Sequence, residues 1–151
     1  MDENGNYAFL KTDFYSGEWV ENGPDDTIVR YLSELRECAR GTVTLILDVH
    51  LPAEACTLPA ADPEHAAFVT IVRPVVSRAS ALHEILHIWR WYAKCIPIIT
   101  KRSEHSTHLL EFAGTLENSV EHSEICPIER HQYPASNSFW DHQLLSTTRE
   151  V

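Results

Sequence analysis

Five residues near the middle of the chain, 83–87, read His-Glu-Ile-Leu-His. They match the His-Glu-x-x-His signature that binds zinc in one large class of metallohydrolases. Two histidines four residues apart lie about 40° apart around an α-helix, so both imidazoles can reach one zinc ion. Glu84 follows the first histidine and lies beside the open coordination position, where it can take a proton from zinc-bound water. The segment therefore predicts a helix with His83 and His87 as zinc ligands and Glu84 as catalytic base.

The residues around this motif favour a helix from about Ser77 to Cys95. Ser77 or Ser80 can cap its start, and Pro97 follows its end. Apolar residues recur there with the spacing of a buried helical stripe, at Leu82, Ile85, Leu86, Trp89 and Ile96. The motif residues form a neighbouring stripe, which we expect next to the core but not inside it. The competing interpretation is a pair of half-exposed surface histidines on an amphipathic helix.

The rest of the pattern predicts an α+β fold in a single domain over residues 1–151. A helix is expected from Asp25 or Asp26 to about Arg40, closed by Gly41. Strands are expected over 42–49 and 68–72, separated by a loop or a turn of helix at 52–64. A second long helix is expected over 103–122 beyond the motif, followed by a short final helix over 138–146.

The composition and charge of the chain limit which partners and which cellular location are expected. No run of about twenty apolar residues is present, so no membrane span is predicted. The acidic, polar start lacks the layout of a signal peptide, and a cytoplasmic protein is expected. The formal charge of −10 argues against a nucleic-acid partner. The four cysteines form no Cys-x-x-Cys pair, although one of them remains an alternative metal ligand.

A catalytic zinc site normally has three protein ligands, and the motif supplies two of them. Extended motifs with Gly and His at fixed distances after the second histidine are excluded, because Arg90 and Ala93 occupy those positions. The predicted helix over 103–122 offers glutamates instead. Glu117 and Glu121 are four residues apart and both flank its apolar stripe. Two such helices packed side by side would bring the two sets of polar residues together.

This order of a His-Glu-x-x-His helix, a short connection and a helix with a ligand glutamate resembles the gluzincin branch of the zincins. Its size and spacing resemble the small zincin domains of phage-immunity and radiation-response metallopeptidases (the ImmA/IrrE-like group). The resemblance covers residues 68–127. It implies a compact zincin-like domain with a small sheet and the second long helix packed beside the motif helix. It also implies Zn²⁺ as the cofactor and Glu121 as the third ligand, followed in preference by Glu117 and His122.

Zincins often supply a donor for the carbonyl oxygen from a segment after the ligand helix. The resemblance therefore implies His131 or Tyr133 in this role. It also implies that the strand over 68–72 edges the cleft and pairs with an extended substrate.

The function that follows is zinc-dependent hydrolysis of peptide bonds in a protein or peptide substrate, through water activated by Glu84. The first alternative is a zincin-like metal-binding regulatory or interaction protein without proteolytic activity. The second is a deformylase-like metallohydrolase. That class takes a cysteine ligand from a Glu-Gly-Cys segment, which neither Cys38 nor Cys56 has around it.

Overall fold

The structure is a computed structural model. It describes residues 13–39, 43–48, 50, 53–59, 68–74, 76–95 and 107–136. The chain divides into two compact units, residues 1–97 and 98–151, which are described in turn. The expectation of a single domain stays a prediction.

The first unit begins with helical segments. A short 3₁₀ helix, η1 (Phe14–Ser16), precedes the helix α1 (Asp26–Cys38). The Asp25 carboxylate caps α1 by accepting a hydrogen bond from the Ile28 amide at 3.0 Å. The predicted start of this helix is therefore confirmed. Its expected closing residue, Gly41, lies outside the described residues.

Three strands form a mixed sheet in the order β1-β3-β2. β3 (Phe68–Val72) runs parallel to β1 (Val43–Leu47) and antiparallel to β2 (Ala55–Pro59). The prediction of a loop over 52–64 missed β2, which is rich in residues that do not favour strands. The expectation that the strand over 68–72 edges a cleft is wrong, because β3 is the central strand and both its sides are paired.

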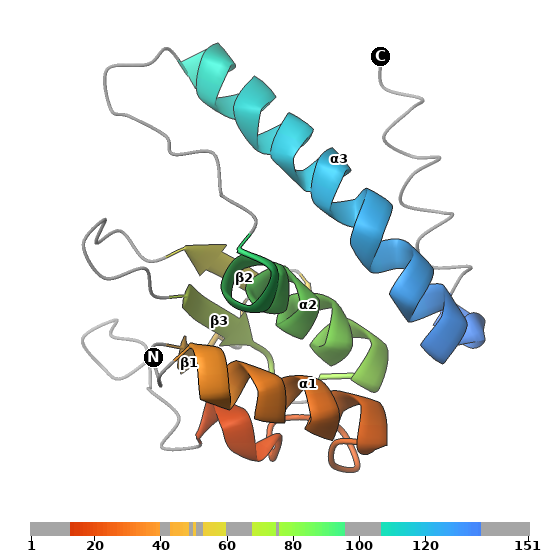
Figure 1. Ribbon diagram of the computed structural model, residues 1–151. Coiled ribbons are helices and arrows are strands. Elements are labelled where there is room, and N and C mark those ends of the chain that lie inside the picture. Colours follow the sequence, from red (N-terminus) through yellow and green to blue (C-terminus); the bar gives the residue numbers. More distant parts are fainter. Residues whose placement is uncertain are drawn as a thin grey trace, which may run out of the picture. The chain divides into compact units, whose positions relative to one another are not determined.

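The core of this unit lies between the sheet and its helices. α2 (Arg78–Lys94) packs beside α1 and also contacts the edge strand β2 (Figure 1). Alternate strand residues bury one face of the sheet, among them Val43, Leu45, Thr70 and Val72. The described mixture of helices and strands agrees with the expected α+β class; its zincin-like character stays a prediction.

The second unit is dominated by one long helix, α3 (Thr107–Gln132), followed by the 3₁₀ turn η2 (Pro134–Ser136). The predicted end near residue 122 is wrong by ten residues, because α3 continues through Pro127. A proline lacks the amide that would bond one turn back, but a helix with strong flanking turns can tolerate this loss. The final helix predicted over 138–146 lies outside the described residues. No helix among those described is long and apolar enough to cross a membrane.

Candidate metal site

The motif helix α2 is fixed at both ends. At its start, the Ser77 hydroxyl caps the helix by accepting a hydrogen bond from the Ser80 amide at 3.3 Å. The Glu54 carboxylate accepts hydrogen bonds from the Ser77 amide at 2.9 Å and from the Ser77 hydroxyl at 2.6 Å. At its end, Cys95 adopts the left-handed conformation with φ 54°. The predicted boundaries of this helix are confirmed, so the motif lies well inside a defined helix.

A side-chain contact with α1 fixes the rotation of α2. The Trp89 indole donates a hydrogen bond to the Glu34 carboxylate at 2.6 Å. The Tyr31 ring meets the Trp89 ring edge-on, with centroids 5.2 Å apart. Because this contact faces α1, it holds the motif residues on another side of the helix.

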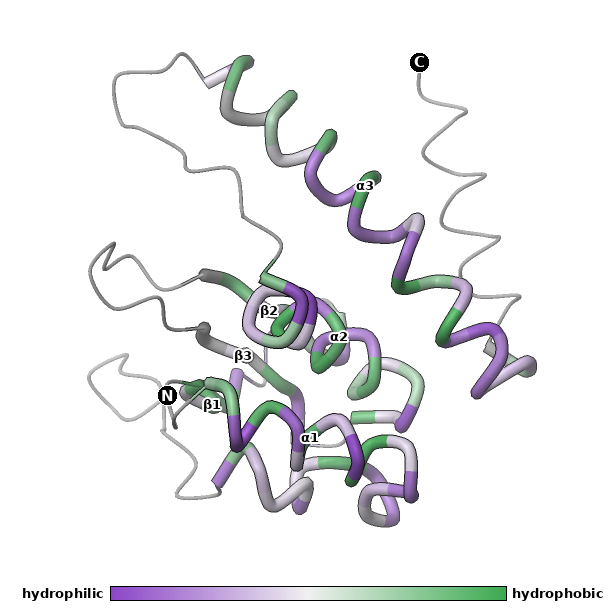
Figure 2. Tube along the Cα trace, in the orientation of Figure 1, coloured by the Kyte–Doolittle hydropathy of each residue, from purple (hydrophilic) through white to green (hydrophobic). Residues whose placement is uncertain are grey.

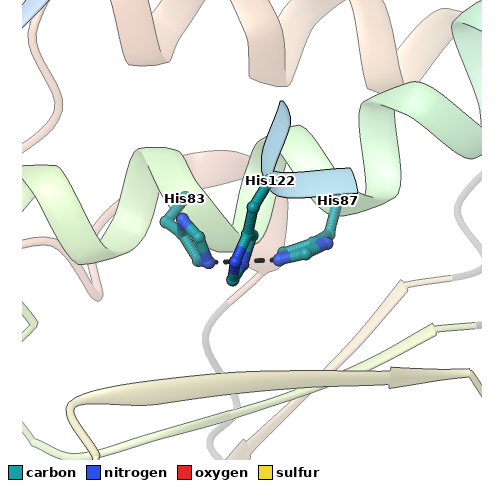
Figure 3. Close-up of side chains that lie close together, drawn as sticks. All are labelled: His83, His87 and His122. Carbon is teal, nitrogen blue, oxygen red and sulfur yellow. Dashed lines mark hydrogen bonds between the residues drawn. The ribbon is translucent and has the colours of Figure 1, made fainter. Parts of the chain in front are cut away.

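The two motif histidines approach each other closely on α2. Their Nε2 atoms lie 3.1 Å apart, and their ring centroids lie 4.7 Å apart (Figure 3). Two zinc-bound nitrogens at about 2.05 Å from a tetrahedral ion would be about 3.3 Å apart. The observed spacing is close to that value and also fits a hydrogen bond between two neutral rings. His83 and His87 therefore have the separation of two ligands to one ion.

The motif is more buried than the sequence pattern predicts. His83 is 5% exposed and Glu84 is 8% exposed, whereas His87 is partly exposed. The expectation that these residues lie outside the core is wrong for the first two. The reason is that α2 is covered by α1 on one side and by β2 on another.

Glu84 is a largely buried residue, although its carboxylate oxygens are not among the buried atoms that lack a partner. Within the described part of the chain it makes no hydrogen bond and no ion pair. Burial and the negative charge of Glu84 raise the pKa of the Cys56 thiol, which places this carboxylate within electrostatic reach of β2. A buried carboxylate is costly unless a donor or cation satisfies it. The surroundings of Glu84 therefore suit a water molecule, a substrate amide or a nearby metal.

His122 completes a set of three histidines that could hold a metal ion with His83 and His87. It lies on α3, in the second unit. Ile125 lies three positions after His122 and Glu129 lies seven positions after it, so these three residues share one face of α3. Ile125 and Glu129 are both fully buried. Sequence reasoning ranked His122 behind Glu121 and Glu117, because the resemblance implied a glutamate.

The glutamates preferred by the sequence are also on α3, where Glu117 and Glu121 are both half-buried. Neither belongs to the group of possible metal ligands found among the described residues. Their roles stay predictions.

The structure does not gather the two proposed oxygen donors around the histidines. His131 is exposed in the last turn of α3, and nine residues place it about 180° from His122. Tyr133 lies just past the helix, where its amide donates to the Glu129 carbonyl at 2.6 Å. Both were expected in a separate segment after the ligand helix, but α3 extends through 132. Their catalytic roles stay predictions.

Arg90 was missed as a functional candidate. It is only 4% exposed and lies three residues after His87 and seven after His83, on their side of α2. A guanidinium offers several N–H donors in a fixed, planar geometry. The spacing of Arg90 from the two histidines places it on their side of the helix and could have identified it. The sequence analysis used Arg90 only to exclude an extended motif.

Comparison with protein-family models, with curated protein sequences and with solved structures gave no match to this chain. The site is therefore defined by its own geometry: two histidines 3.1 Å apart beside a buried carboxylate on a capped helix.

Proposed function

We propose that this chain is a zinc-dependent peptidase in which His83 and His87 bind the metal and Glu84 is the catalytic base. The observation that carries the proposal is the 3.1 Å approach of the two Nε2 atoms next to an 8% exposed carboxylate. The 3.1 Å approach fits two ligands of one ion as well as a hydrogen bond between the rings, and the neighbouring carboxylate favours the metal. The Glu84 side chain is 8% exposed and makes no hydrogen bond within the described residues, which suits a chemical role.

We assign the third ligand to His122. Three imidazoles leave a tetrahedral zinc one open position, as in catalytic sites. His122 shares a face of α3 with Ile125 and Glu129, the two fully buried residues of that helix. Glu121, which the resemblance favoured, remains the alternative and would change the charge of the site by one unit.

When bound, zinc would polarise the substrate carbonyl and make a water molecule easier to deprotonate. Glu84 accepts the proton of the attacking water and passes it to the departing amine. Its burial keeps bulk water away and strengthens its electrostatic interactions. Negative charge develops on the carbonyl oxygen, and the positive Arg90 side chain is the donor that meets it.

The decisive experiment combines metal analysis with a peptidase assay on the full chain. Purified protein is expected to hold about one equivalent of zinc, and the His87→Ala variant none. Glu84→Gln keeps the metal but loses hydrolysis of a degenerate fluorogenic peptide library by about 10²–10⁴-fold. His50→Ala, which removes an exposed histidine outside α2 and α3, is the matched control that keeps both the metal and the activity.

Two results would contradict the proposal. Metal-free wild-type protein that cannot be loaded with zinc would identify the histidine pair as a simple hydrogen bond. Equal hydrolysis by wild type and Glu84→Gln would identify the activity as a contaminant.

A non-proteolytic metal-binding interaction module is the second candidate function. One observation favours it: α3 carries a row of exposed apolar side chains, at Leu109, Phe112, Leu116 and Val120. Such a surface is typical of proteins that bind partners. Zinc bound at the site with no hydrolysis of any library peptide would support this function over the first.

A further inference from the structure

One face of α3 exposes a continuous apolar stripe. It consists of Leu109 (49% exposed), Phe112 (65%), Leu116 (48%) and Val120 (52%). Steps of three or four residues place these four side chains in one row along the helix. Figure 2 shows hydrophobic residues recurring between hydrophilic ones along α3. Large apolar side chains scattered singly need no explanation, but four in a row do.

The stripe lies opposite the side that α3 buries. Leu116 and Ile125 are nine residues apart, which places them about 180° apart around the helix. Ile125 and Glu129 are fully buried, whereas every member of the stripe is about half exposed or more. Ile125 and the stripe therefore face opposite sides of α3.

The surroundings of the stripe are strongly acidic. Residues 107–124 contain four glutamates and neither lysine nor arginine. Glu117 and Glu124 are seven residues apart, so they lie together along one edge of the stripe. The Glu124 side chain is exposed and that of Glu117 is half-buried. The stripe therefore joins apolar contact area to local negative charge.

We propose that this stripe docks a cationic amphipathic helix of another protein. A single row of apolar side chains, one per turn, matches the ridge that one helix offers to another. Lysine or arginine residues beside the partner's apolar row meet Glu117 and Glu124 at the edge. This charge complementarity speeds association and makes it dependent on salt.

A second copy of this chain fits the stripe poorly. The formal charge of −10 and the acidic edge would bring like charges together. An anionic membrane would be repelled for the same electrostatic reason.

The test measures binding of a fluorescent synthetic helix of leucine and lysine to the full chain by anisotropy. Phe112→Asp and Leu116→Asp are expected to weaken binding by about tenfold or more. Val29→Asp is the matched control, because Val29 is an isolated apolar residue on α1 with 47% exposure. It leaves binding unchanged. The Glu117→Gln, Glu124→Gln double variant weakens binding several-fold at low salt and flattens its salt dependence.

Folding of each variant is checked by circular dichroism, so that loss of binding reports the surface. The proposal is overturned if the wild-type protein does not bind the cationic helix. It is also overturned if the aspartate variants bind the helix as tightly as the wild type. A wild-type dimer that the aspartate variants abolish overturns it as well, because the occupant is then a second copy. Binding of the wild type to anionic vesicles, lost in the same variants, also overturns it. None of these outcomes depends on zinc or on hydrolysis.

Discussion

The helices α2 and α3 differ in what holds them in place. α2 is capped by Ser77 and closed by Cys95, and five of its apolar residues are fully buried, namely Ala81, Leu82, Ile85, Leu86 and Ile88. α3 is nine residues longer, contains Pro127 and leaves a row of apolar side chains about half exposed. The position of α2 is therefore determined by its caps and by its buried residues. In contrast, α3 is a long helix of which only part is buried.

This difference matters for the proposed function. α2 carries two histidines and the proposed base, Glu84, on one capped helix. α3 carries the proposed third ligand on one side and the exposed stripe on the other. We infer that α2 is preorganised for chemistry, whereas α3 presents a surface for partners.

The sharpest contrast is expected from truncating one leucine on each helix. Leu86 is fully buried on α2, so Leu86→Ala should lower the free energy of unfolding by about 2–5 kcal/mol. Leu116 is 48% exposed on α3, so Leu116→Ala should change it by about 0.5 kcal/mol or less. Urea unfolding measures both. Equal costs would show that the stripe is covered and that the two helices are not different.

The second prediction concerns the ligand supplied by α3. His122→Ala should weaken zinc binding by more than about 100-fold, since removing a ligand costs more than removing its hydrogen-bonding support. Glu121→Ala, one residue away, should change zinc affinity only slightly. Competition with a chromogenic chelator gives both affinities. If Glu121→Ala weakens zinc binding more than His122→Ala does, the third ligand is Glu121, as the sequence resemblance implied.

A smaller effect is expected at the helix start. Ser77→Ala removes the cap of α2 and should cost about 1 kcal/mol of unfolding free energy. The matched control is Ser33→Ala on α1, where the hydroxyl donates to the Val29 carbonyl within the helix and should contribute little. Thermal unfolding compares the two variants. A negligible effect of Ser77→Ala would mean that Glu54 alone organises this end.

These contrasts explain how much the sequence could predict. The boundaries of α2 were accessible because Ser77, the apolar stripe and Pro97 are local signals of a helix start, face and end. The strand β2 was not, because Ala55–Pro59 becomes a strand by pairing with β3, and that pairing is not local. The same pairing moved β3 to the centre of the sheet and removed it as a cleft edge.

The candidate site divides in the same way. His83, Glu84 and His87 follow from spacing within one helix, so a five-residue pattern sufficed. The burial of Glu84 depends on α1 and β2, which are distant in sequence. The end of α3 also depends on context, because the helix passes the expected end near residue 122 and continues through Pro127. His131 was therefore expected in a separate segment rather than in the last turn of α3.

The smallest effect is predicted for the acid stability that Glu54 gives to the start of α2. Partial burial raises the pKa of Glu54, but hydrogen bonds from the Ser77 hydroxyl and amide lower it more, so its pKa lies below the ordinary value. A group with a lowered pKa in the folded state stabilises the fold above its unfolded pKa, about 4 for glutamate. That contribution is lost as the pH falls through the lower, folded pKa. Wild type should therefore unfold at a higher temperature than Glu54→Gln at neutral pH, by a modest margin because the carboxylate is partly screened by solvent. This difference in unfolding temperature should vanish in acid below pH 4. A difference that does not change with pH would show that the shape of the Glu54 side chain, rather than its charge, stabilises the start of α2.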